Sequence, residues 1–397
     1  MDPIEKLSIT PAERDLLEKA LELALRGDFA KVAAILVEAL TRPSAVEGSR
    51  GFLGKAHDLA SRAILAAHDH SAEAQETVRR ICHLSIQRYG RQPWSDLNEA
   101  CLLHLAGAHD DAVALYRAAA CGAEILLSLS NGCKTVVTLP DARSLSTSDT
   151  DDIASRFPPV VIERLEVSRE SPVIFVAADH TYLMEHGDRF FTSVRKYGAG
   201  LPAHLHLVNP RPEDHDLIDT AMRDGRWPAL NLSTEFYDGL DQKAYYSAVR
   251  FIRAPLLLEI YGSALLISDI DAVYQTFIMP TLPPLDNFDV GLFIKKDRFR
   301  ANPWQSITAN VLMYVPTERG RRFCQAVALL ILKLFNRAEW GKLWFIDQNA
   351  LYHIFLLARA DAWELRVMDL GLPITGLGLP GRIWRTNTTL PSVWNGP

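Results

Sequence analysis

The sequence predicts a helical module followed by an α/β domain. A chain of 397 residues is long enough for about two or three domains. From residue 11 to about 121, apolar residues recur at helical spacing, with few β-branched runs. From Pro172 onward, short apolar runs alternate with amphipathic segments. That order is typical of a parallel sheet covered by helices on both faces.

The helical module is predicted from its caps, breaks and periodicity. Residues 10–13, TPAE, form a capping box with a hydroxyl before the helix, Pro at its first position and Glu at its third. A break at 27–28 ends this helix, and 29–40 form a second helix that can fold back on it. The order of helix, break and helix returns at 98–120. Residues 50–90 hold two more amphipathic helices, so three hairpins are expected.

The breaks at Gly27 and Gly107 are separated by two repeats of about 40 residues. Residues 1–121 therefore resemble a degenerate tetratricopeptide-type repeat array, which would offer a concave surface to a partner. The period is longer than the family's length of about 34 residues, and most of its Trp, Gly and Pro markers are missing. A plain helical bundle without a ligand groove is the alternative.

Residues 122–171 mix polar and apolar character, and SLSTSDTDD at 144–152 is predicted to be an exposed loop. We predict a linker here, which divides the chain into a helical module at 1–121, a linker at 122–171 and an α/β domain at 172–397. Within the α/β domain, strands are predicted at 172–178, 204–210, 229–232, 264–268 and 290–294.

Composition and charge exclude several classes of protein. Apolar residues make up 48% and charged residues 23%, which excludes wholesale disorder, a collagen-like repeat and a disulfide scaffold. The formal net charge of -6 gives no basic surface for nucleic acid, which is not an expected partner. The five cysteines lack the spacing of a zinc or redox motif and are predicted to be reduced, buried thiols.

The sequence predicts a cytoplasmic protein. Its first residues show no basic stretch followed by an apolar one, so no signal peptide is expected. The most apolar run, 326–332, is interrupted by Lys333 and is far shorter than the roughly 20 residues needed to cross a bilayer. We therefore expect no transmembrane segment.

Polar residues follow two of the predicted strands. Ligands of open α/β sheets bind beyond the carboxyl ends of strands, so these positions are candidates for a site. The run ALLIS is followed by Asp269 and Asp271, which share one face of an extended chain. Two ionised carboxylates this close repel each other, and Mn²⁺ or Mg²⁺ completed by substrate phosphates relieves the repulsion. In the alternative, the two carboxylates cap a loop or pair with arginine.

Four segments together carry a resemblance. They are FVAADHTY at 175–182, YYSAVRFIRAPLLLEIYG at 245–262, DID at 269–271 and WFIDQNALYHIF at 344–355. Residues 172 to about 355 resemble the nucleotide-sugar-binding domain of retaining family 8 glycosyltransferases. This group includes glycogenin and bacterial lipopolysaccharide galactosyltransferases and has the GT-A fold.

The resemblance implies a role for residues in each segment. The first segment is similar to the family's uridine-binding turn, so its residues inherit contacts with the nucleotide. Arg250 would bind the diphosphate or the donor sugar, because its fork of donors suits phosphate. The aspartates of the third segment would hold Mn²⁺, and the Asp-Gln pair of the fourth lies at the sugar-transfer centre. The implied residues are Ala178, Asp179, Thr181, Tyr182, Arg250, Asp269, Asp271, Asp347 and Gln348.

Two departures from the family pattern leave alternatives open. Where the family has an NAG turn, this chain has ITANVLMY, with Thr308 and Asn310 at the outer positions. Where the family has a C-terminal histidine as a third metal ligand, this chain has RIWRTN at 382–387. There, Arg385 could contact phosphate or Asn387 could give an oxygen ligand. Surface charge for Arg250 and a helix-capping role for Asp347 are the structural alternatives at those positions.

The resemblance implies a metal-dependent glycosyltransferase that uses a nucleotide sugar, a UDP-sugar, and retains the anomeric configuration. An amide is a weak nucleophile, so front-face attack by the acceptor is favoured over a covalent intermediate at Gln348. The helical module suggests a protein or glycan acceptor, or another partner, docked on it. The alternatives are a catalytically degenerate interaction scaffold and a nucleotidyltransferase that makes the nucleotide sugar.

Overall fold

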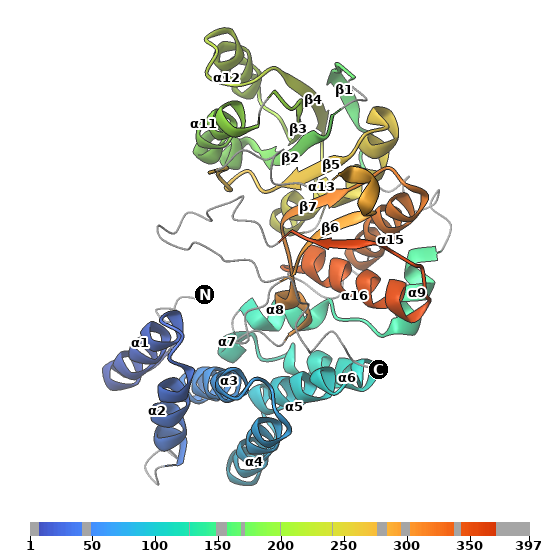
Figure 1. Cartoon of the computed structure of the whole chain (residues 1–397). Coiled ribbons are helices and arrows are strands. Elements are labelled where there is room, and N and C mark those ends of the chain that lie inside the picture. The colour runs from blue at the N-terminus through green and yellow to red at the C-terminus, as the bar shows by residue number, and fades with distance from the viewer. Residues whose placement is uncertain are drawn as a thin grey trace.

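The computed structural model describes residues 8–41, 49–126, 128–147, 157–167, 171–198, 200–239, 241–275, 284–294, 302–336 and 343–370. Helices of the N-terminal part gather at one end of the molecule, and the sheet with its flanking helices lies at the other (Figure 1). The predicted fold class, a helical module followed by an α/β domain, is confirmed.

The helices predicted in the module all form. Thr10 and Glu13 make the expected capping box at the first of them, with Glu13 N donating to Thr10 Oγ1 over 3.3 Å. Gly27 and Gly107 have φ of 79° and 81°, a left-handed conformation that ends a helix and suits glycine. The module contains α1 (Pro11–Leu25), α2 (Phe29–Thr41), α3 (Arg50–Ala67), α4 (Ala72–Tyr89), α5 (Pro93–Leu105) and α6 (His109–Ala119).

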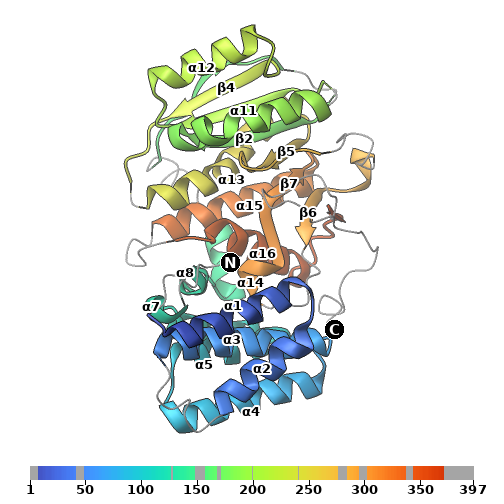
Figure 2. The same cartoon turned by 90° about the vertical axis from the view of Figure 1, so that its left-hand side faces the viewer.

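Helix α3 lies at the centre of the module. It packs against α1, α2, α4 and α5, and nearly all of its side chains are buried. The core around it includes Leu17 of α1, Leu36 of α2, Trp94 of α5 and Tyr116 of α6. Figure 2 shows these helices stacked side by side beneath the α/β domain. The likeness to tetratricopeptide repeats stays a prediction.

The segment 122–171, predicted as a linker, is structured where the structure describes it. It contains α7 (Ala123–Leu126), α8 (Ser128–Lys134), α9 (Leu139–Thr147) and β1 (Val161–Arg164). Helix α9 packs on α15 (Glu318–Phe335) and α16 (Ile346–Ala360), and β1 joins the sheet. The segment packs because Leu129, Val136 and Ala142 are apolar and buried. Part of the predicted loop at 144–152 lies in α9, and the rest lies outside the described residues.

The sheet contains each predicted strand and is mixed rather than parallel throughout. Its order is β1-β4-β3-β2-β5-β7-β6-β8, in which β2 to β5 run parallel while β1 and β7 are antiparallel to their neighbours. Strand β7 follows β6 closely in the sequence and pairs with it antiparallel. The remaining strands are β2 (Val173–Asp179), β3 (Ala203–Val208), β4 (Leu230–Glu235), β5 (Leu265–Ser268), β6 (Val290–Ile294), β7 (Ile307–Tyr314) and β8 (Val367–Asp369).

Helices cover both faces of the sheet, as predicted. Val173 and Phe175 of β2 face the core formed with α13 (Gln242–Tyr261), α15 and α16, whereas Ile174 and Val176 face α11 (His180–Tyr197) and α12 (Pro212–Arg223). This alternation follows from the two-residue period of a strand. Among the described residues, no helix is both long and apolar enough to cross a membrane.

Candidate active site

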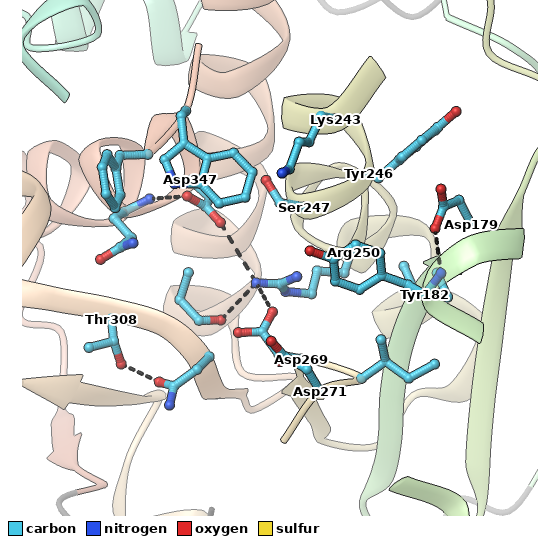
Figure 3. Close-up of a pocket in the computed structure, with 18 residues that line it drawn as sticks. Asp179, Tyr182, Lys243, Tyr246, Ser247, Arg250, Asp269, Asp271, Thr308 and Asp347 are labelled. Carbon is cyan, nitrogen blue, oxygen red and sulfur yellow. Dashed lines mark hydrogen bonds and ion pairs between the residues drawn. The ribbon is translucent and has the colours of Figure 1, made fainter. Parts of the chain in front are cut away.

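A pocket of about 270 Å³ opens beyond the carboxyl ends of β2 and β5. Five stretches of chain line it: the end of β2 with the start of α11, one face of α13, the turn after β5, strand β7, and residues 344–348 at the start of α16 (Figure 3). Most of the residues predicted from the sequence meet here. They are Ala178, Asp179, Tyr182, Arg250, Asp269, Asp271, Thr308, Asn310, Asp347 and Gln348.

Two predicted residues do not line the pocket. Thr181 is an exposed residue in the first turn of α11, one position before Tyr182. Successive residues of a helix point in different directions, so Tyr182 turns toward the pocket while Thr181 turns elsewhere. Arg385, like Asn387, lies outside the described residues, so its predicted contact with phosphate stays a prediction.

Arg250 is the buried centre of the polar network in the pocket. Its Nη2 lies 2.6 Å from Asp269 Oδ1 and 3.7 Å from Asp347 Oδ2, and it donates to the main-chain oxygen of Ala309 over 3.1 Å. Figure 3 shows the guanidinium between the two carboxylates. Arg250 is therefore no surface charge of α13, because it joins the turn after β5, strand β7 and helix α16.

The two aspartates after β5 have different partners. The main-chain nitrogen of Asp269 donates to Asn310 O over 2.9 Å, which ties the turn to β7, and its side chain pairs with Arg250. Asp271 holds Arg189 through its main-chain oxygen at 3.2 Å. Its carboxylate oxygen Oδ1 is buried and has no hydrogen-bond partner among the residues that the structure describes. A buried, unsatisfied carboxylate oxygen is costly, and a bound cation would satisfy it.

Among the described residues that line the pocket, negative charge exceeds positive charge. They include four carboxylates, Asp179, Asp269, Asp271 and Asp347, and two cations, Arg250 and Lys243. Burial raises the pKa of Asp269, and the neighbouring carboxylates add to the rise while Arg250 opposes it. Burial also raises the pKa of Asp347, against the lowering effect of Arg250. The pocket therefore favours either protons or a cation, and carboxylate oxygens suit Mg²⁺ or Mn²⁺.

Asp179 and Tyr182 form the rim of the pocket beside β2. Asp179 is the N-cap of α11, and its Oδ1 accepts a hydrogen bond of 2.9 Å from Tyr182 N. The cap orients the start of α11, which leaves the Tyr182 ring 37% exposed at the pocket. An aromatic ring in this position is able to stack on a nucleotide base.

Asp347 and Gln348 lie in the first turn of α16. The N-cap is Phe345 with φ of 75°, so the capping role considered for Asp347 is wrong. Asp347 is buried and accepts a hydrogen bond of 2.8 Å from Gln348 N. The Gln348 amide is assigned with its nitrogen toward the main-chain oxygens of Trp304 and Ile307, because only this orientation gives hydrogen bonds to them, at 2.6 and 3.3 Å.

Thr308 and Asn310 lie in strand β7, at positions that share one face of the sheet. Both line the pocket, and the Thr308 hydroxyl donates to Asn310 Oδ1. The same oxygen accepts a hydrogen bond of 3.1 Å from Val311 N. This segment is thus a buried strand and not a turn, although it contributes polar groups to the pocket.

The other residues on the helical face that carries Arg250 were not predicted from the sequence. Lys243, Tyr246 and Ser247 precede it by seven, four and three residues, and all line the pocket. This spacing places them on the same side of α13 as Arg250, so the helical period starting from Arg250 predicts that they line the pocket. Trp344 is also missed, and Lys243 Nζ lies 5.3 Å from its ring centre.

No family model and no curated protein matches the chain. The solved structures to which it is similar include WbbM, a bifunctional glycosyltransferase, at 15% identity and a TM-score of 0.34, over 52% of this chain and 40% of that one. Apo GlyE of Streptococcus pneumoniae has 13% identity and a TM-score of 0.33, over 51% of this chain and 46% of that one. Mouse xyloside xylosyltransferase 1 has 13% identity and a TM-score of 0.32, over 50% of this chain and 86% of that one. The chain spans less than half of the first two, and similarities this low establish no family.

Proposed function

We propose that the chain is a glycosyltransferase whose donor is a nucleotide sugar, namely a UDP-sugar. The proposal depends on one observation. Residues of five separated stretches of sequence, predicted to contact nucleotide, phosphate or sugar, line one pocket, and carboxylates outnumber cations among its described lining residues. This pocket lies beyond the carboxyl ends of parallel strands, where α/β proteins bind ligands.

A divalent cation, Mn²⁺ or Mg²⁺, fits the residues present. Asp269 and Asp271 would hold it, and Asp271 Oδ1, which has no hydrogen-bond partner in the described part of the chain, supports this assignment. The described residues contain no group of three or more His, Cys, Asp or Glu side chains suited to a metal. Two carboxylates completed by donor phosphates are a usual arrangement for Mg²⁺. When bound, the cation would neutralise charge on the departing diphosphate.

The other lining residues fit the parts of the donor. Ala178, Asp179 and Tyr182 would contact the nucleoside, with the tyrosine ring against the base. Arg250 and Lys243 supply positive charge for the diphosphate. Beside them, Asp347 would orient sugar hydroxyls and Gln348 would lie near the reacting carbon. Retention by front-face attack is part of the proposal, as is docking of a protein or glycan acceptor on the helical module.

Binding of UDP tests the donor and the cation together. UDP at 100 times its Kd should stabilise the protein by about 2.7 kcal/mol when Mn²⁺ is present, and by much less without it. Asp271→Asn should abolish the dependence on Mn²⁺, whereas Asp216→Asn, at an exposed position of α12, should preserve it. Calorimetric titration with UDP, with and without Mn²⁺, measures both effects. Equal UDP binding in the Asp271 variant would exclude the cation site.

Turnover tests the reaction itself. The wild-type protein should release UDP from at least one of UDP-glucose, UDP-galactose, UDP-xylose and UDP-N-acetylglucosamine in the presence of Mn²⁺. Release without an added acceptor is slow hydrolysis, and a faster rate with an acceptor identifies transfer. If the protein neither binds UDP nor releases it under any of these conditions, the proposed activity is wrong.

One observation favours the scaffold alternative. Asp269 already forms an ion pair with Arg250, which is the arrangement expected if this carboxylate serves the fold. A cation would have to compete with Arg250 for that carboxylate. Absence of any UDP effect, with or without Mn²⁺, would favour an interaction protein whose α/β domain is catalytically inactive.

A further inference from the structure

Helix α8 lies where the helical module meets the α/β domain (Figure 1). Gly132 of α8 accepts a hydrogen bond of 2.8 Å through its main-chain oxygen from the side-chain nitrogen of Asn349. The same nitrogen donates to Thr135 Oγ1 over 2.7 Å. Asn349 is fully buried and directly follows Gln348 in α16. Residues near the end of α8 therefore fix the first turn of the helix that carries Gln348.

Trp304 contacts the same glycine. It belongs to α14 (Pro303–Ser306), yet its buried side chain is part of the core of the helical module. The ring packs edge-on against Tyr116 of α6, with centroids 5.5 Å apart and planes at 71°. A Cβ at Gly132 would lie 2.4 Å from Trp304 Cε2. Only glycine leaves room for the indole here.

Trp304 in turn contacts the proposed catalytic residue. In the assigned orientation of the Gln348 amide, the main-chain oxygens of Trp304 and Ile307 are its two acceptors. Strand β7 begins at Ile307, directly after α14, and carries Thr308 into the pocket. A displacement of Trp304 would therefore move both acceptors of Gln348 and the start of a pocket strand.

We propose that Gly132 and Trp304 are positioning residues, through which the helical module holds Gln348 in the orientation that sugar transfer requires. The inference rests on the proposed function. The residues assigned to the nucleotide and the cation come from β2, α11, α13 and the turn after β5, not from α8 or α14. Disturbing Gly132 should therefore lower the rate of transfer while leaving donor binding in place.

Gly132→Ala is the direct test, because the added methyl group collides with Trp304. Gly54→Ala is its matched control: it introduces a comparable collision between α3 and α7, where a Cβ would lie 2.0 Å from Ile125 Cγ2. We expect kcat for UDP release to fall about 100-fold in Gly132→Ala, because a misplacement of Gln348 by about 1 Å is enough for a loss of that size. The Kd for UDP with Mn²⁺ should stay within about twofold of wild type, and Gly54→Ala should keep a wild-type kcat per folded molecule.

Hydrogen exchange gives a readout that does not depend on activity. Amides of residues 346–351 should exchange faster in Gly132→Ala than in both wild type and Gly54→Ala. If wild type releases no UDP, the proposed function fails while this comparison still tests the positioning. Unchanged exchange at 346–351 overturns the inference. So does an active wild type whose kcat survives the Gly132 substitution, or an equal loss of kcat in both glycine variants.

Two milder variants keep the test open if Gly132→Ala does not fold. Thr135→Val removes one acceptor of Asn349 with little change in shape, and kcat should fall several-fold at unchanged Kd for UDP. Trp304→Phe combined with Gly132→Ala provides space for the added methyl group, so it should fold, with a kcat lower than that of wild type. Failure of both variants to change kcat as stated contradicts the inference.

Discussion

Arg250 is the residue on which the geometry of the pocket depends most. It is 4% exposed and interacts with Asp269, Asp347 and the main chain of β7. A buried arginine with several partners at once fixes their relative positions, because its planar fork of donors is rigid. The same residue joins segments that are distant in sequence, so it couples the stability of the α/β domain to the shape of the site.

Arg250→Met should therefore destabilise the protein strongly. Removing one partner from a buried ion pair costs about 3 kcal/mol, since the remaining carboxylates lose their counter-charge. Arg319→Met is a suitable control, because Arg319 is 42% exposed and pairs with the exposed Glu364. That change should cost less than about 1 kcal/mol. Urea unfolding compares the two, and equal costs would contradict the central role of Arg250.

Individual residues of the site were predictable where a short pattern carries their chemistry. Asp269 and Asp271 follow a buried strand, so their shared direction follows from the strand period. Tyr182 could be predicted from a motif, but Thr181 could not be excluded without knowing that α11 starts at His180. Trp344 was not predictable in this way, because it lies in the turn before α16, where no helical or strand period indicates which side chains face the pocket.

At the scale of elements, the glycines that end α1 and α5 show a purely conformational requirement. A Cβ at Gly107 would meet nothing within 4 Å, yet its φ is 81°. The residue is therefore glycine because of its backbone conformation and not because of crowding.

Gly107→Ala should destabilise the helical module by about 1 kcal/mol through this backbone strain. Gly107→Asn should cost less, because asparagine tolerates the left-handed conformation better than alanine does. Thermal or urea unfolding of the two variants gives the order. An alanine variant as stable as wild type would show that the turn can adopt another conformation.

Elements with a strong apolar pattern were predictable, and those without one were not. Strands β2 and β5 are mostly continuous apolar runs, because they lie in the middle of the sheet and are covered on both faces. Strand β3 is also buried throughout, although His204 and His206 alternate with its apolar residues. Strand β7 is buried along its length, but Thr308 and Asn310 interrupt its pattern because they belong to the pocket. Strand β1 lies at the edge of the sheet, where exposed positions carry little signal.

At the scale of the whole molecule, several histidines are buried in neutral form. Burial lowers the pKa of His57 to about 4 and those of His204 and His353 to about 3, and it also lowers the pKa of His104. Histidine in an unfolded chain has a pKa of about 6.5. Below that value the unfolded chain binds protons that the folded protein does not.

The free energy of unfolding should therefore be greatest above pH about 6.5 and should fall as the pH decreases toward 4. Each histidine contributes a slope of up to about 1.4 kcal/mol per pH unit in this range. His353→Gln removes one of these protonation sites, so it should reduce the slope by up to about 1.4 kcal/mol per pH unit. Urea titrations between pH 7.5 and pH 5 measure it, and a constant unfolding free energy over that interval would contradict the neutral burial of these groups.

The place of Trp304 in the core of the helical module also bears on how the protein is made. Gly132 and the Asn349 that it binds are 217 residues apart in the sequence. During synthesis, the first part of a chain emerges and begins to fold before the later part exists. The N-terminal helices thus leave the ribosome before the tryptophan that completes their core, and they finish packing together with α14 and α16 of the sheet domain.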